Sequence, residues 1–265
     1  MSNKSAIEYL APAQKSEFPE EWYDLSSPEH FWFQWRLKAM LDLARDWGVR
    51  LDAPLRVLDL GAGGGALRDQ LEACTPWIVD ISDLNMVALE HAGGGRGRTL
   101  CYDVLQPDPT LLGSYDAVLL FDVLEHIPDT PPFVRAVLRH LKPGGHLLMN
   151  VPASQMLYGP YDVAAGHVRR YDQATLAAEF RETPLTVLDI RYWGFLLVPI
   201  VVARNLFVRG KGTANASVRH GFEPPSPLVH RFLRALFRIE TAVARRPPFG
   251  SSLLLAGRVP PLAGG

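Results

Sequence analysis

The chain of 265 residues is poor in cysteine, in net charge and in long hydrophobic runs. Its two cysteines, Cys74 and Cys101, form no C-x-x-C pair, which disfavours a disulfide scaffold or a thiolate zinc site. We therefore expect no metal site. The longest apolar run, 192–203, has 12 residues and contains Pro199, whereas a membrane-spanning helix needs about 20. This run is too short to cross a bilayer.

Charge is nearly balanced overall but unevenly distributed. The net charge of -1 provides no global positive field for nucleic acid. Residues 1–193 carry 17 basic and 26 acidic side chains, whereas residues 194–246 carry nine basic and two acidic ones. The later stretch is a candidate for contact with an anionic partner or a membrane surface. Because the N-terminus has Glu8 and no basic stretch before an apolar core, we expect no signal peptide and a cytoplasmic protein.

Hydrophobic patterning predicts an α/β fold. An aromatic-rich helix is expected from residue 29 to about Trp47, and short apolar runs then alternate with helical segments. Between the last two expected strands, residues 193–250 are too long for a bare connection and should hold two helices, near 195–208 and 227–245, joined by a loop at 210–225. The seven expected strands are 56–60, 77–81, 99–102, 117–121, 146–151, 185–192 and 251–259.

The first strand ends in a glycine-rich loop, Gly61-Ala62-Gly63-Gly64-Gly65. Glycines at this position let backbone N–H groups approach an anionic ligand at the start of the next helix. A purely structural tight turn is one alternative. The form Gly61-x-Gly63-x-x-Ala66, with Asp80 19 residues after Gly61, also satisfies a dinucleotide fingerprint, which keeps a nicotinamide-dependent oxidoreductase open.

Three further stretches favour a nucleoside cofactor other than a nicotinamide dinucleotide. Asp59 precedes the glycines, residues 122–129 read D-V-L-E-H-I-P-D, and residues 141–147 read L-K-P-G-G-H-L. Over 30–193 and 251–259 the chain resembles class I S-adenosylmethionine-dependent methyltransferases of the small-molecule branch, types 11 and 12. The resemblance implies a Rossmann-like, doubly wound sheet of seven mostly parallel strands, with an antiparallel last strand and a helical insertion before it.

The resemblance also implies a methyl donor and residues that bind it. The donor is S-adenosylmethionine, with S-adenosylhomocysteine as product, and Asp80 takes the ribose hydroxyls while Asp103 accepts from the adenine amino group. The alternative for Asp103 is an ordinary loop acid in solvent. The full set of expected cofactor residues is Asp59, Gly61, Gly63, Gly65, Asp80, Ile81, Asp103, Val104, Phe121 and Asp122.

The expected catalytic groups are two histidines and a glutamate. A general base near neutral pKa helps when the acceptor is a hydroxyl, an ammonium or an activated carbon, and histidine suits this role. His126 follows Glu125 where related enzymes place a Glu-His pair, and His167 lies in a D-x-x-x-G-H-x-R-R-Y segment at 162–171. The alternatives are a histidine that anchors the following helix and a brace of Arg169 or Arg170 with nearby acids.

The acceptor is expected to bind between the N-terminal segment and the segment after the fifth strand. Residues 1–50 are predicted to form a helical lid and 51–265 the methyltransferase domain, although a plain packing helix is equally consistent with the aromatic residues. Arg36 is a candidate partner for an acid or a substrate anion. The expected substrate residues are His30, Trp32, Trp35, Tyr161 and Arg169.

The insertion predicts a small, lipophilic acceptor, with an anionic group as an option. A basic amphipathic helix at 227–245 either caps an apolar pocket or lies in a membrane interface. Residues 121–124 read Phe-Asp-Val-Leu where DNA amino-methyltransferases carry a Pro-Pro-aromatic motif, so no nucleic-acid partner is expected. A methyltransferase-like protein with a non-methylating activity remains a further alternative.

Overall fold

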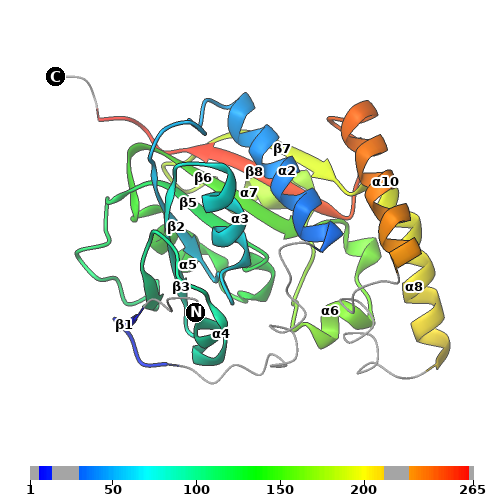
Figure 1. Cartoon of the computed structure of the whole chain (residues 1–265), viewed down its shortest axis with the longest axis horizontal. Helices are drawn as coiled ribbons and strands as arrows, with labels where there is room; N and C mark the ends of the chain where they lie inside the picture. Colours follow the sequence, from blue (N-terminus) through cyan, green and yellow to red (C-terminus); the bar gives the residue numbers. More distant parts are fainter. Residues whose placement is uncertain (1–5, 14–29, 212–226, 263–265) are drawn as a thin grey trace.

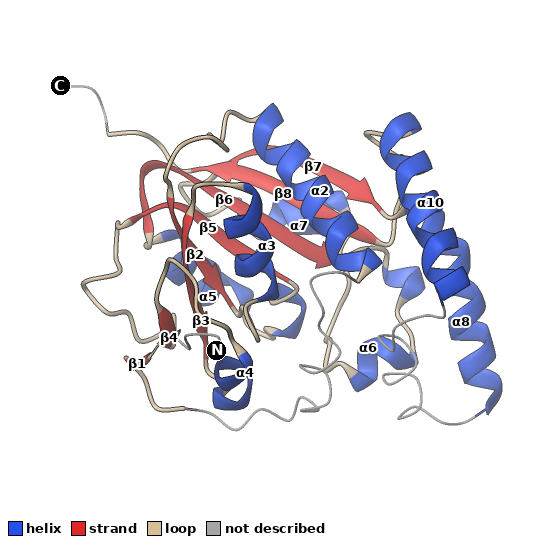
Figure 2. Ribbon diagram, in the orientation of Figure 1, coloured by secondary structure: helices blue, strands red, loops and turns tan. Residues whose placement is uncertain are grey.

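The computed structural model describes residues 6–13, 30–211 and 227–262. Its centre is an eight-stranded sheet with the order β1-β4-β3-β2-β5-β6-β8-β7, flanked by helices on both faces (Figures 1 and 2). The strands are β1 (Ile7–Tyr9), β2 (Arg56–Leu60), β3 (Ile78–Asp83), β4 (Thr99–Cys101), β5 (Tyr115–Phe121), β6 (Leu141–Pro152), β7 (Thr186–Trp193) and β8 (Ser252–Arg258). The helices are α2 (Phe31–Asp46), α3 (Ala66–Cys74), α4 (Met86–His91), α5 (Thr130–Leu138), α6 (Pro160–Ala164), α7 (Gln173–Ala178), α8 (Val198–Lys211) and α10 (Pro227–Val243).

The strand order confirms the predicted doubly wound fold. β2 pairs in parallel with both β3 and β5, so the chain winds outward in both directions from this strand. β8 pairs antiparallel with β6 and β7, as expected for the last strand. The sheet has one strand more than predicted, because β1 pairs in parallel with the edge strand β4. In such sheets ligands bind at the carboxyl ends of the strands where the winding reverses, here β2 and β5.

Two apolar layers hold the helices on the sheet. Alternate residues of β2 point to opposite faces: Val57 packs in the layer with α2 and α3, and Leu58 packs in the layer with α5 and α7. Figure 1 shows α2 and α3 in front of the sheet and α5 and α7 behind it. Strands covered on both faces are apolar throughout, which explains the continuous hydrophobic runs in the sequence.

The insertion between β7 and β8 contains the two predicted helices. α8 carries Pro199 in its first turn, where a missing N–H costs no helical hydrogen bond. Glu240 of α10 accepts hydrogen bonds from the Gly194 and Leu196 N–H groups at 2.7 and 2.8 Å, which fastens α10 to the end of β7. The predicted connecting loop lies largely outside the described residues. Within those residues, no helix is both long and apolar enough to span a bilayer.

Candidate active site

The glycine loop lies where the sequence predicts it, between β2 and α3. Gly61, Gly63 and Gly65 all have positive φ, at 71°, 54° and 76°. A Cβ at Gly61 would lie 2.4 Å from Cγ2 of Val123, so only glycine allows the loop to approach the segment after β5 this closely. Gly65 caps the N-terminus of α3. The loop therefore joins the carboxyl ends of β2 and β5.

Asp59 lies beneath this loop in β2 and is 1% exposed. Its Oδ2 atom is buried without a hydrogen-bond partner. Burial raises the pKa of Asp59 to about 7, and the positive charges of Arg36 and Arg68 only partly offset this. A buried carboxylate oxygen without a donor is costly, so the site fits a ligand that brings a cationic or N–H group to it.

Asp80, the predicted ribose-binding acid, does not lie at the end of β3. Its side chain is 2% exposed inside β3, where it accepts hydrogen bonds from Arg98 Nη2 at 2.9 Å and the Tyr115 hydroxyl at 2.8 Å. These hydrogen bonds hold the Asp80 carboxylate in a buried network before the end of β3. Ile81, also predicted as a cofactor residue, is fully buried beneath the glycine loop.

Asp83 is the acid at the carboxyl end of β3. It accepts hydrogen bonds from the Gly63 and Asn85 N–H groups, each at 2.9 Å, so it touches the glycine loop directly. Burial raises its pKa. The sequence signal for it was Asn85, which caps α4 two residues later and so marks Asp83 as the strand end.

Asp103 follows β4, on the neighbouring strand end, as predicted. The Tyr102 N–H donates to the Asp83 carbonyl at 3.3 Å, which brings the two strand ends together. The Asp103 carboxylate accepts from the Leu105 N–H at 2.9 Å and from Gln106 Nε2 at 3.0 Å, so it also closes its own loop. Val104 is 6% exposed and belongs to the core.

At the end of β5, Asp122 adopts φ 57°, which is uncommon for a residue with a side chain. Its carboxylate pairs with Arg36 Nη1 at 2.5 Å and accepts from Asn150 Nδ2 at 2.6 Å. The Arg36 guanidinium lies 5.4 Å from the centroid of the preceding Phe121 ring. Arg36 thus meets an acid, one of its two predicted roles, and it ties α2 to the strand end.

His126 and His167, the two candidate bases, lie together with Glu125 beside this strand end. Glu125 and His126 belong to a 3₁₀ turn, η1 (Leu124–His126), that follows β5, and the two histidine rings meet edge to face with centroids 4.8 Å apart. Burial and the neighbouring His167 lower the pKa of His126 to about 4. One donor atom from each of the three residues lies within 4.8 Å of the others, a spacing that would admit a divalent cation.

Asp162 orients His167 within this group. The Asp162 Oδ1 atom lies 2.8 Å from His167 Nδ1 and accepts from Arg170 Nε at 2.8 Å. Although burial alone would raise it, these hydrogen bonds lower the pKa of Asp162, so it stays ionised. His167 Nε2 then faces Oε1 of Glu125 at 3.9 Å.

Glu125 is fully buried, and neither of its carboxylate oxygens has a hydrogen-bond partner. Burial and the nearby Asp122 raise its pKa well above the ordinary value. Burial in this setting favours the protonated form of the carboxyl.

The expected substrate residues divide into two groups. Tyr161 lies beside His167, with the two ring centroids 6.3 Å apart. Arg169 instead donates to the Pro128 carbonyl at 2.7 Å and lies 4.0 Å from the Glu179 carboxylate, and these contacts hold its side chain. Trp35 is 1% exposed and packs against Trp193 with centroids 6.1 Å apart, so it is a core residue rather than a lid surface.

The other two predicted substrate residues lie at the start of α2. His30 caps the helix by accepting from the Trp32 N–H at 3.3 Å, and burial lowers its pKa to about 4. The Trp32 ring lies 4.8 Å from the Arg36 guanidinium. Both residues are therefore tied to α2 itself, and much of the predicted lid before them, at 14–29, lies outside the described residues.

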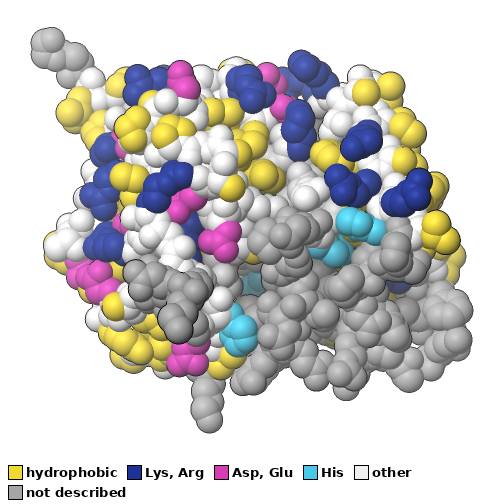
Figure 3. All heavy atoms as spheres, in the orientation of Figure 1, with side chains coloured by type: hydrophobic (Ala, Val, Ile, Leu, Met, Phe, Trp, Pro, Cys, Tyr) yellow, Lys and Arg dark blue, Asp and Glu magenta, His cyan; other side chains and the backbone are white. Residues whose placement is uncertain are grey.

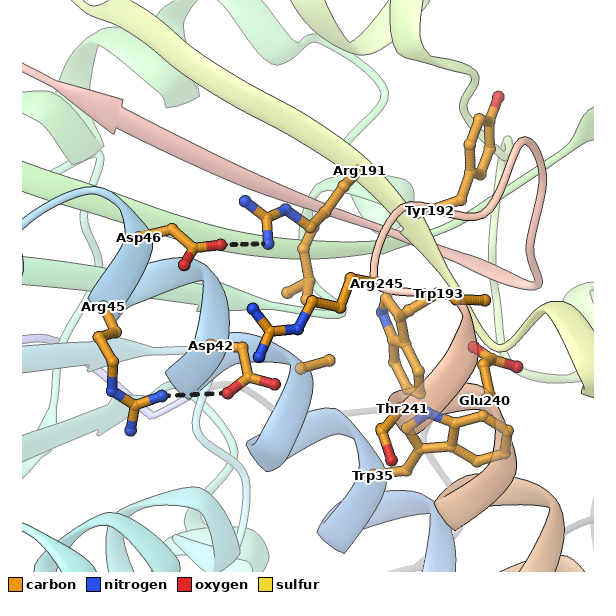
Figure 4. Close-up of a pocket in the computed structure, with 13 residues that line it drawn as sticks. Trp35, Asp42, Arg45, Asp46, Arg191, Tyr192, Trp193, Glu240, Thr241 and Arg245 are labelled. Atoms are coloured by element: carbon orange, nitrogen blue, oxygen red, sulfur yellow. Dashed lines mark hydrogen bonds and ion pairs between the residues drawn. The ribbon is translucent and has the colours of Figure 1, made fainter.

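A separate cavity of about 110 Å³ lies between α2, β7 and α10 (Figure 4). Arg45 and Asp46 of α2, Arg191 of β7 and Arg245 line it together with Trp35. Figure 4 shows the ion pairs Arg191–Asp46 and Arg45–Asp42 on its wall. Pockets for drug-sized ligands measure about 300–1,000 Å³, so this hollow does not compete with the strand ends as a cofactor site.

Comparison with known proteins agrees with this geometry. A family model described as a methyltransferase domain matches residues 22–190, more than half of the chain. The chain belongs to the class I methyltransferase family. This methyltransferase is 34% identical over 140 residues to a ubiquinone biosynthesis O-methyltransferase of Xanthomonas oryzae pv. oryzae. That match covers 49% of this chain and 55% of the relative, so the chain spans about half the length of the curated relatives it matches.

Solved structures share the fold at low sequence identity. A Haemonchus contortus phosphoethanolamine N-methyltransferase in complex with S-adenosylmethionine superposes with a TM-score of 0.52 at 18% identity, covering 84% of this methyltransferase and 52% of that chain. The [4+2]-cyclase SpnF superposes with a TM-score of 0.57 at 18% identity, covering 96% and 99%. The family match favours the S-adenosylmethionine interpretation of the glycine loop over the nicotinamide alternative.

Proposed function

We propose that this methyltransferase transfers the methyl group of S-adenosylmethionine to a hydroxyl oxygen of a small, lipophilic acceptor. The observation that carries the proposal is the Asp162–His167 pair. Gly61 contacts Val123, the residue immediately before η1, so the cofactor loop and the group around His167 share one edge of the sheet. The curated relatives named for O-methylation support oxygen as the acceptor atom.

The residues at the strand ends fit this cofactor. Asp59 offers an unpartnered buried oxygen to the ammonium group, and Asp83 offers acceptors to the ribose hydroxyls. The glycine loop and the start of α3 would face the carboxylate end of the bound cofactor, and Asp103 would accept from its adenine amino group. When bound, S-adenosylmethionine supplies an electrophilic methyl carbon, whose bond to sulfur breaks as the bond to the acceptor oxygen forms.

His167 then takes the hydroxyl proton. Because Nδ1 donates to ionised Asp162, the lone pair of the neutral ring is on Nε2, the atom that faces Glu125. Asp162 stabilises the imidazolium that forms, as a carboxylate does in other acid–histidine pairs. His126, with its low pKa, stays neutral and lies against the His167 ring. The products are the methyl ether, S-adenosylhomocysteine and a proton held on His167.

The test is transfer of labelled methyl from S-adenosylmethionine into a fractionated metabolite and lipid extract, with release of S-adenosylhomocysteine measured in parallel. We expect His167→Gln to lower turnover about 100-fold or more, in line with loss of a general base, while cofactor affinity stays unchanged. His126→Gln is the matched control and should keep most of the turnover. Equal losses in the two variants would refute His167 as the base.

Two additions to this assay separate the alternatives. Running it with and without a chelator shows whether the three donor atoms of Glu125, His126 and His167 need a cation for turnover. Acceptor consumption without release of S-adenosylhomocysteine would indicate a non-methylating activity, as the similarity of fold to a cyclase allows. Loss of labelled product in every fraction would contradict the proposed methyl transfer.

We also propose that α8 and α10 contact an anionic membrane surface, where a lipophilic acceptor would dissolve. Figure 3 shows Lys and Arg side chains over α10 with hydrophobic side chains along its outer border. Five apolar side chains of α10 are 46–77% exposed, and the arginines among them are exposed too. The apolar set is Leu228, Val229, Phe232, Ile239 and Val243, and the basic set is Arg231, Arg234 and Arg238.

Cosedimentation with vesicles tests this contact. We expect binding to vesicles with 30% phosphatidylglycerol, weakened by 0.5 M salt because the charges are screened. Phe232→Ser together with Ile239→Ser should abolish it. Leu105→Ser, a change at an exposed residue on the β4 end of the molecule, is the control and should bind like the unmodified protein. Binding that survives the double substitution would exclude this face.

A further inference from the structure

Arg204 extends from α8 toward the segment that carries the base. α8 is fixed there by its next residue, because Asn205 Nδ2 donates to the Leu157 carbonyl at 2.8 Å. A Cβ at Gly159 would lie 2.7 Å from the Asn205 side chain, so glycine is needed for this contact. The Arg204 guanidinium carbon lies 4.6 Å from the centroid of the Tyr161 ring. Packing therefore fixes the position of the Arg204 side chain.

Arg204 differs from the neighbouring arginines in its charge balance. Arg36 pairs with Asp122, Arg170 with Asp162, and Arg191 with Asp189. Arg204 has no ion pair within the described part of the chain, and its Nε atom is buried without a hydrogen-bond partner. Burial lowers its pKa. A guanidinium stays charged in proteins, and no ion pair within the described part of the chain offsets this half-buried charge, so Arg204 is a candidate to bind an anion.

Tyr161 connects Arg204 to the base. The same ring that carries the guanidinium meets the His167 ring edge to face at 6.3 Å. Arg204 and His167 thus both contact Tyr161, with no other ring between them. A molecule lying against Tyr161 would reach both: its hydroxyl at His167 Nε2 and a second polar group at the guanidinium.

We infer that Arg204 is the specificity residue of the acceptor site and binds an oxyanion, a carboxylate or a phosphate, on the acceptor. This inference rests on the proposed function, because it assigns the acceptor site that His167 serves. Asp162, whose charge acts favourably on Arg204, already accepts from His167 and Arg170 and forms no ion pair with Arg204. The planar guanidinium suits a bidentate contact with either oxyanion.

Binding without turnover tests the inference. Calorimetry of the full chain, saturated with S-adenosylhomocysteine, is run with three aryl probes: 4-hydroxybenzoate, 4-hydroxyphenyl phosphate and 4-hydroxybenzamide. We expect at least one anionic probe to bind about tenfold more tightly than the neutral amide, as charge-assisted hydrogen bonds do. The preferred anion then identifies carboxylate or phosphate as the group recognised.

Variants assign that preference to one side chain. Arg204→Met should remove it and leave amide binding unchanged, while Arg204→Lys should restore part of it because the charge remains. Arg135→Met, at an exposed arginine on α5, should behave like the unmodified protein. Anionic preference that persists in Arg204→Met, or is absent from the unmodified protein, would overturn the inference.

The inferred oxyanion site and the proposed methyl transfer can fail independently of each other. Failure of methyl transfer from S-adenosylmethionine to every acceptor would refute the enzyme activity without changing the binding result. Transfer to anionic acceptors with undiminished turnover in Arg204→Met would keep the enzyme activity and refute the oxyanion site.

Discussion

The raised pKa of Asp59 makes the stability of the folded protein depend on pH. Its pKa is about 7 in the folded protein against an ordinary value of 3.8. An acid with a raised folded pKa binds its proton more tightly when folded, so stability is full below the unfolded pKa and falls as pH rises from about 4 to about 7. A shift of this size corresponds to roughly 4 kcal/mol above pH 7, taken as an upper limit for a fully buried group.

Asp59→Asn removes this cost because the amide carries no charge at any pH. We expect the variant to be more stable than the unmodified protein at pH 8 by about 2–4 kcal/mol, with a gap smaller by about 2 kcal/mol at pH 5. Urea unfolding at the two pH values measures the gap directly.

The same substitution should weaken binding of S-adenosylmethionine, because the cofactor's ammonium group loses its carboxylate partner. Binding to the unmodified protein should therefore strengthen between pH 6 and 8 and binding to Asp59→Asn should not. A stability gap that is constant with pH would refute the raised pKa. A gap that changes with pH while cofactor affinity is unaffected would leave the titration intact and remove Asp59 from the cofactor site.

Three further substitutions test other parts of the site. Glu125→Gln should retain most of the turnover, because glutamine copies the uncharged carboxyl that burial favours; a loss as large as that of His167→Gln would show that the ionised form is needed. Trp35→Ala should lower the free energy of unfolding by about 3–5 kcal/mol, as expected for a core aromatic. An unchanged midpoint of urea unfolding would contradict a core role and favour the predicted role in substrate binding. Gly61→Ala should weaken cofactor binding, because a Cβ there would lie 2.4 Å from Val123 and φ is positive; unchanged affinity by calorimetry would contradict the contact between loop and η1.

The fold could be predicted from the sequence largely because its strands are buried on both faces. Continuous apolar runs and the glycine loop located β2–β8 and the insertion with its two helices. β1 was missed because Ile7–Tyr9 is largely exposed at the edge of the sheet and so forms no apolar run. β4 is equally short, but its three residues are all buried, and it was predicted.

The site was predicted only in part, because contacts between residues far apart in the sequence decide which side chains face the glycine loop. Asp80 and Asp83 are three residues apart, and what distinguishes them is the network of Arg98 and Tyr115 around Asp80, which local sequence does not reveal. The pairing of Asp162 with His167 could have been predicted, because the two residues lie five positions apart in one recognisable segment. The role of Arg204 could not be predicted, because its lack of an ion pair is seen only when the structure shows how the surrounding acids are paired.

The most direct measurement compares cofactor binding in Asp83→Asn and Asp80→Asn. Calorimetry with S-adenosylmethionine should show an affinity lower by about 1–3 kcal/mol in Asp83→Asn, which loses the charged acceptor beside the glycine loop. Asp80→Asn should unfold more easily yet, where folded, bind the cofactor with unchanged affinity. Weaker binding in Asp80→Asn alone, or no binding to the unmodified protein, would contradict the placement of the methyl donor at these strand ends.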